Sequence, residues 1–149
     1  MYGFGDTDVV GRALNTLIWR RDSTMLIQVI GLLDDAVSEG WRGLATADFE
    51  RQGYPRFIAV DFAHSDPQNS MMTRYRSASF VRETMKRVEY AAVLSGSSAG
   101  PTVVIRAVLR TLGLPNLVML SDADEFTQSV ASMLRGVRPT RGALSKSTG

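Results

Sequence analysis

The stretch that decides the fold is residues 56–87, which read RFIAVDFAHSDPQNSMMTRYRSASFVRETMKR. It opens with an apolar run of strand character, residues 56–62, continues through a polar turn, residues 64–69, and enters a basic helix at Ser70. A strand that passes through a polar loop directly into a helix places the loop at the carboxyl edge of a sheet, where open α/β folds expose functional groups. We therefore predict that Ser70 lies at a functional edge.

Ser70 supports two interpretations that are compatible with each other. Helix N-termini carry unpaired N–H groups and the positive end of the helix dipole, so a phosphate on Ser70 would be partly stabilised there. Serine is also favoured as a plain helix N-cap, because its hydroxyl accepts a hydrogen bond from the backbone. The sequence thus makes Ser70 a candidate phosphorylation site and a candidate cap.

The rest of the chain alternates strands and helices in the order β-β-α-β-α-β-α-β-α. An almost continuously apolar run at residues 24–30 predicts a central strand that is buried on both faces. The other strands are predicted at residues 16–19, 56–62, 88–94 and 117–120, and the helices at residues 37–52, 71–87, 101–112 and 122–134. This alternation predicts an α/β fold with a mixed, mostly parallel five-stranded sheet and about four helices, the first strand being an antiparallel edge partner.

The chain is long enough to form one domain with a core of its own, without support from a metal or a disulfide. The predicted elements place that domain at residues 14–134. Residues 1–13 are glycine-rich and mixed in polarity, which predicts a flexible segment. Residues 135–149 consist largely of Gly, Pro, Ser, Thr and Arg, which predicts a basic disordered tail.

Charge and composition exclude several classes of function. The net charge is +2, but the tail holds four basic residues and no acid, which leaves −2 for residues 1–134. Binding to a nucleic-acid backbone needs a concentrated basic surface on the domain itself, so direct nucleic-acid binding is not expected. The lack of cysteine excludes a disulfide scaffold and a thiol nucleophile. No apolar run is long enough to span a bilayer and no signal-peptide pattern is present, so we expect a cytoplasmic protein.

The order of elements and four local motifs resemble the STAS domain family, whose founding members are the bacterial anti-sigma factor antagonists. The resemblance covers roughly residues 14–134. Its motifs are GLLD at residues 31–34, the spacing from Gly31 to Asp61, VLSG at residues 93–96 with LRTLGL at residues 109–114, and LSDADEF at residues 120–126. Each motif is weak alone, but four in the right order are more specific.

The resemblance implies a non-enzymatic signalling regulator of transcription in a bacterium. In this family a serine that follows an aspartate, in an Asp-Ser-Ser-Gly turn, is phosphorylated by a kinase that doubles as the anti-sigma factor. The corresponding pair is Asn69-Ser70, with an asparagine in place of the aspartate and no glycine. Partner binding to an anti-sigma factor or serine kinase is expected through Asn69, Met71, Met72, Arg74 and Arg76. The resemblance leaves a homodimer open.

The basic helix after Ser70 also has two interpretations. Its arginines and lysine fit a docking surface for an acidic partner or an anionic headgroup. They also fit an ordinary solvated outer face. The runner-up function is a small-ligand or lipid-binding module, similar to STAS-like proteins that resemble Sec14 domains. Such a module would use an apolar cavity beneath helices 71–87 and 101–112.

Three further groups of residues could form a phosphate loop, a hydrolase site or a metal site, but each also has a simpler interpretation. The loop with Ser95, Gly96, Ser97 and Ser98 has the small residues that let backbone N–H groups hold a phosphate, but it lacks the Walker lysine and the G-x-G-x-x-G spacing, which favours a tight turn. A hydrolase would rest on Ser70, His64 and Asp66, and the chain has no G-x-S-x-G motif. His64 with Asp61 and Asp66 is a poorly specified metal site. We therefore predict no catalytic residue, no metal and no cofactor.

Overall fold

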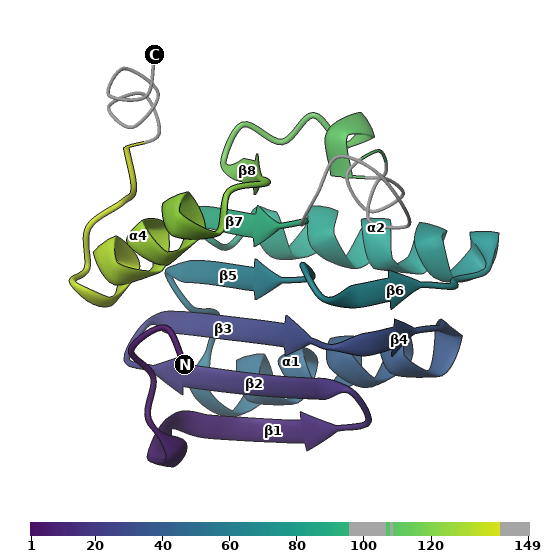
Figure 1. The fold of residues 1–149 in the computed structure, drawn as a ribbon, viewed down its shortest axis with the longest axis horizontal. Coiled ribbons are helices and arrows are strands. Elements are labelled where there is room, and N and C mark those ends of the chain that lie inside the picture. The colour runs from purple at the N-terminus through teal and green to yellow at the C-terminus, as the bar shows by residue number, and fades with distance from the viewer. Residues whose placement is uncertain (96–106, 108, 141–149) are drawn as a thin grey trace.

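The computed structural model describes residues 1–95, 107 and 109–140. These residues form a six-stranded sheet in the order β1-β2-β3-β5-β7-β8, and a second, two-stranded sheet of β4 and β6 (Figure 1). The strands are β1 (Val9–Ala13), β2 (Thr16–Arg21), β3 (Thr24–Val29), β4 (Gly31–Leu33), β5 (Phe57–Asp61), β6 (Ser65–Pro67), β7 (Tyr90–Leu94) and β8 (Leu117–Leu120). The helices are η1 (Asp6–Asp8), α1 (Asp35–Gln52), α2 (Met71–Met85) and α4 (Ala123–Leu134), and residues 109–111 are also helical.

The sheet is mixed, and most of it is parallel. Strands β1, β2 and β3 are joined by antiparallel pairs, whereas β3, β5, β7 and β8 are all parallel. All six residues of β3 are buried, which is the reason its sequence is almost continuously apolar. The predicted α/β class, the mostly parallel sheet and the positions of the five predicted strands are confirmed.

Helices cover both faces of the sheet. On one face, α1 and α2 pack over a cluster that includes Trp41, Phe49, Ile58 and Val93. On the other face, α4 packs with the first residues of the chain over a second cluster, in which Phe4, Phe57 and Phe126 are buried. This division into two layers places α2, and Ser70 at its start, on the same side of the sheet as α1.

The predicted strand count of five is wrong, because β1 is a sixth strand. It lies within residues 1–13, where the sequence predicted only a flexible segment, and Phe4 of the same segment is 5% exposed. The strand was missed because it is short and its apolar alternation is interrupted by Gly11. That glycine allows α1 to pack closely, since a Cβ there would lie 3.2 Å from Leu44 Cδ2. The sequence also gave no sign of the three-residue strands β4 and β6.

Two predicted segments lie partly outside the described residues. Of the predicted helix at residues 101–112, the structure describes only residue 107 and residues 109–112, and of the tail it describes residues 135–140. The domain boundaries remain a prediction. In the part of the chain that the structure describes, no helix has the length and apolar composition needed to cross a membrane.

Candidate functional site

Ser70 lies at the first turn of α2, at the carboxyl edge of the sheet that the sequence predicted. Its Oγ accepts a hydrogen bond from the Thr73 backbone N–H at 3.2 Å, so the N-cap interpretation is confirmed. The Ser70 backbone N–H donates to Asp35 Oδ1 at 2.8 Å. Ser70 itself is exposed. The hydroxyl is thus accessible at the surface, while its backbone is tied to the start of α1.

Asp35 is the charged neighbour of Ser70. Its pKa is lowered, first by the hydrogen bond from the Ser70 backbone N–H, and further by the side chains of Ser70 and Thr73 and the charge of Arg76. The Asp35 carboxylate therefore already accepts a hydrogen bond from an N–H group at the start of α2. A phosphate on Ser70 would have to compete with it for that N–H. Any added negative charge on Ser70 would face an ionised carboxylate.

The substitution Asp35→Asn is expected to remove a pH-dependent part of the stability. A carboxyl whose pKa is lower in the folded than in the unfolded state stabilises the protein above its unfolded pKa, near 3.8 here, and this contribution is lost as the pH falls through the folded pKa. Wild type should therefore melt at a higher temperature than Asp35→Asn at about pH 6, and the difference should shrink below about pH 3.

Thermal unfolding followed by circular dichroism across this pH range measures the effect. Asp66→Asn is a matched control, because Asp66 is exposed on β6 and its carboxylate accepts a hydrogen bond from the side chain of Gln68, away from the start of α2. A stability difference for Asp35→Asn that stays constant from acid to neutral pH would contradict a lowered pKa of Asp35 in the folded state.

Asn69 holds the turn before α2 in place. With its amide oriented to satisfy its surroundings, the nitrogen lies 3.1 Å from Leu33 O, 2.9 Å from Asp34 O and 2.8 Å from Ser38 Oγ, and donates to these oxygens. These three residues belong to β4 and the start of α1. The Asn69 amide therefore joins the turn before α2 to β4 and the start of α1. The sequence did not predict this role. A role of Asn69 in partner binding remains a prediction.

Apolar side chains are exposed in the first two turns of α2. Met71 is 77% exposed, Met72 59% and Tyr75 70%. Exposed large apolar side chains that gather in one place mark interaction sites more often than isolated ones do. Arg76 is exposed on the same helix, so the apolar side chains stand next to a cation. We call Ser70, Met71, Met72, Tyr75 and Arg76 the α2 docking face.

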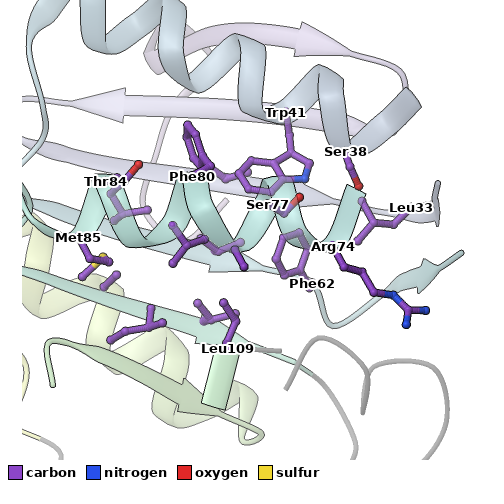
Figure 2. Close-up of a pocket in the computed structure, with 18 of the residues that line it drawn as sticks. Leu33, Ser38, Trp41, Phe62, Arg74, Ser77, Phe80, Thr84, Met85 and Leu109 are labelled. Atoms are coloured by element: carbon purple, nitrogen blue, oxygen red, sulfur yellow. The ribbon is translucent and has the colours of Figure 1, made fainter. Parts of the chain in front are cut away.

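Arg74 differs from the other arginines of α2, because it is half-buried. Its Nε is buried and has no hydrogen-bond partner among the described residues. It lies at one end of a cavity between α1, α2 and the sheet, and its guanidinium extends away from the other labelled side chains (Figure 2). The cavity has a volume of about 110 Å³. The runner-up function would use a cavity beneath helices 71–87 and 101–112; the cavity described lies beneath α2, and residues 101–106 and 108 lie outside the described residues.

Asp61, one of the carboxylates of the metal interpretation, is bound by groups within the protein. Asp61 is buried and accepts hydrogen bonds from Tyr2 Oη at 2.8 Å, Ala63 N at 3.0 Å and Gln28 Nε2 at 3.3 Å. Burial raises the pKa of Tyr2, and Asp61 raises it further. His64 is exposed, and the described residues hold no group of three side chains that could bind a metal ion. Asp61 therefore anchors the N-terminal segment.

Ser95 is the described residue of the predicted phosphate loop. It is fully buried, and its backbone N–H donates to Leu120 O at 3.0 Å. Gly96, Ser97 and Ser98 lie outside the described residues, so phosphate binding there remains a prediction. Sequence reasoning missed Asp35 and Ser38, because they lie more than thirty positions before their partners, Ser70 and Asn69, and reach them only in the folded chain.

Comparison with solved structures supports the fold assignment. The anti-sigma factor antagonist SpoIIAA in its unphosphorylated form is similar over 82% of this chain and 99% of its own, with a TM-score of 0.54 and 15% sequence identity. No protein-family model and no curated protein sequence matches the chain. The likeness at this identity concerns the fold. The chain thus has the STAS fold of an anti-sigma factor antagonist, as its sequence motifs predicted.

Proposed function

We propose that this protein is a non-enzymatic STAS-type signalling regulator that binds a partner protein through the α2 docking face. The observation that carries this proposal is the exposure of Met71, Met72 and Tyr75 directly after Ser70. Methionine side chains are flexible and polarisable, so they adapt to a partner surface. The SpoIIAA-like fold supports an anti-sigma factor or a related serine kinase as the partner, in the cytoplasm of a bacterium.

The charge of α2 favours an acidic partner surface. Helix α2 and the turn after it carry six basic or acidic side chains: Arg74, Arg76, Arg82, Glu83, Lys86 and Arg87. The acid of this set, Glu83, pairs with Lys86 at 3.0 Å. The arginines therefore leave an excess of positive charge beside the exposed methionines. Such complementarity accelerates association and fixes the orientation of the partner.

We propose that phosphorylation of Ser70 weakens this complex. A phosphate adds nearly two negative charges. On Ser70 they would stand beside the Asp35 carboxylate, which already holds the Ser70 backbone N–H. The phosphate would also give an acidic partner a like charge to meet, and like charges across an interface cost several kcal/mol. The modification would thus act within the docking face, at the N-terminal end of α2.

A binding measurement with purified partners tests the docking face. Met72→Asp should weaken binding to the cognate anti-sigma factor or kinase by roughly 10-fold or more, because a charge replaces an apolar contact. Isothermal titration calorimetry against each candidate from the same organism gives the dissociation constants. Val137→Asp is the matched control, since Val137 is an exposed apolar residue beyond α4. Equal affinity for wild type and Met72→Asp would overturn the proposed face.

A further inference from the structure

The cavity between α1, α2 and the sheet is lined mainly by apolar side chains. Trp41 and Phe49 come from α1, and Phe80 and Val81 from α2; the Trp41 and Phe80 rings meet edge to face at 5.4 Å (Figure 2). The sheet contributes Ile27, Ile58, Val60, Ala91 and Val93. Protein interiors are otherwise packed as densely as organic crystals, so a space of this kind leaves its lining without contacts that a ligand would supply.

The size of the cavity fits a small apolar group. Its volume of about 110 Å³ compares with roughly 150 Å³ for an engineered apolar cavity that stays dry and binds benzene. An apolar lining offers water few hydrogen bonds, so water is a poor occupant. A short hydrocarbon chain is a better one, because each methylene that leaves water for an apolar site gains free energy.

Arg74 places a positive charge at one end of the cavity, which favours a ligand with a negative group there. Its Nε is buried without a partner, and none of the five ion pairs found in the described part of the chain involves it. Its Nη1 lies 4.0 Å from Met71 Sδ, a weak acceptor. A buried donor without an acceptor is unfavourable, and the planar guanidinium fork matches a carboxylate in a bidentate arrangement.

These observations together specify a ligand. We propose that the cavity binds a small amphipathic carboxylate, with its hydrocarbon chain between α1 and α2 and its carboxylate paired with Arg74. The chain replaces missing apolar contacts, and the carboxylate supplies the hydrogen-bond acceptor that Arg74 Nε lacks. The cavity lies beneath α2, whereas the α2 docking face is exposed at the surface, and Arg74 is the basic residue of α2 that lines the cavity.

The two tryptophans of the chain allow a direct test with 8-bromooctanoate, whose bromine quenches indole fluorescence at short range. Trp41 lines the cavity, whereas Trp19 belongs to the cluster on the opposite face of the sheet. Saturable quenching is expected in wild type and in Trp19→Phe, and not in Trp41→Phe. Equal quenching of both tryptophans, or no saturable quenching up to about 1 mM ligand, would overturn the proposal.

Arg74→Gln tests the role of the guanidinium. Loss of a charge-assisted pair should raise the dissociation constant for octanoate roughly 10-fold or more. Arg82→Gln is the matched control: it removes an exposed charge from the same helix without touching the cavity, and should leave the affinity unchanged. Octanol and octylamine should bind at least roughly 10-fold more weakly than octanoate to wild type. Equal octanoate affinities for wild type and Arg74→Gln, with both folded by circular dichroism, would overturn the site.

Discussion

Replacing Arg20 by methionine will lower the free energy of unfolding by about 3–5 kcal/mol. Arg20 lies on β2, and its side chain, 6% exposed, forms an ion pair of 2.9 Å with Asp48 of α1, whose side chain is fully buried. The guanidinium also donates to Gly53 O at 2.7 Å, at the end of α1. Without Arg20, the Asp48 carboxylate loses its buried counter-ion and keeps only the exposed Arg51 at 3.4 Å and a hydrogen bond from Gln52 Nε2 at 2.6 Å. Urea unfolding followed by circular dichroism gives the difference.

Two variants separate this effect from a general loss of charge. Arg21→Met breaks a partly exposed pair with Asp8, in which Arg21 is 41% exposed, and should cost about 0–1 kcal/mol. The double variant Arg20→Met with Asp48→Leu should recover most of the lost stability, because replacing a buried pair by apolar residues is often neutral. A loss in Arg20→Met no greater than in Arg21→Met would contradict the prediction.

Ser70→Glu will weaken binding to the cognate partner by roughly 10- to 100-fold, whereas Ser70→Ala will leave it within about threefold of wild type. Glutamate at this position stands beside the Asp35 carboxylate and presents a like charge to an acidic partner. Alanine removes the N-cap, which costs helix stability of about 1 kcal/mol, but introduces no charge. Titration calorimetry with the purified partner, together with the enzymatically phosphorylated protein, measures both effects.

The substitution Asp35→Asn supplies the matched control for this switch. It removes the carboxylate next to Ser70 but keeps a side-chain oxygen that accepts from the Ser70 N–H. In that background, Ser70→Glu should lose less affinity than in wild type, since one of the two repulsive charges is absent. Equal partner affinities for wild type, Ser70→Ala and Ser70→Glu would rule out the switch and leave the docking face to bind constitutively.

The sequence predicted the local part of the site, because those features depend on neighbours along the chain. Ser70 caps α2 because serine follows a polar turn and precedes a helical run. Met71 and Met72 are exposed because they lie at the start of that helix, before its buried face begins. The α/β class was also predictable, since strand and helix periods and their order follow from residue types, and the STAS fold was expected from the resemblance of four local motifs.

Contacts between distant segments could not be predicted in the same way. Strand β1 has a weak pattern of its own and is stabilised by pairing with β2, with Gly11 opposite Ile18. The amide of Asn69 meets β4 and the start of α1, and the carboxylate of Asp35 meets the Ser70 N–H, only because α1 packs beside α2. Nothing in the local pattern of residues 31–38 announces these bonds, since their partners lie about thirty residues away.

The sequence by itself therefore determined the order of the elements, the buried central strand β3 and the position of Ser70 at a helix start. The tertiary structure alone decided which charges meet at that start, which arginine of α2 is half-buried, and where space remains between the layers. The physical reason is the range of the interactions: periodicity and capping act within a few residues. Ion pairing, burial and cavities depend on how α1, α2 and the sheet pack.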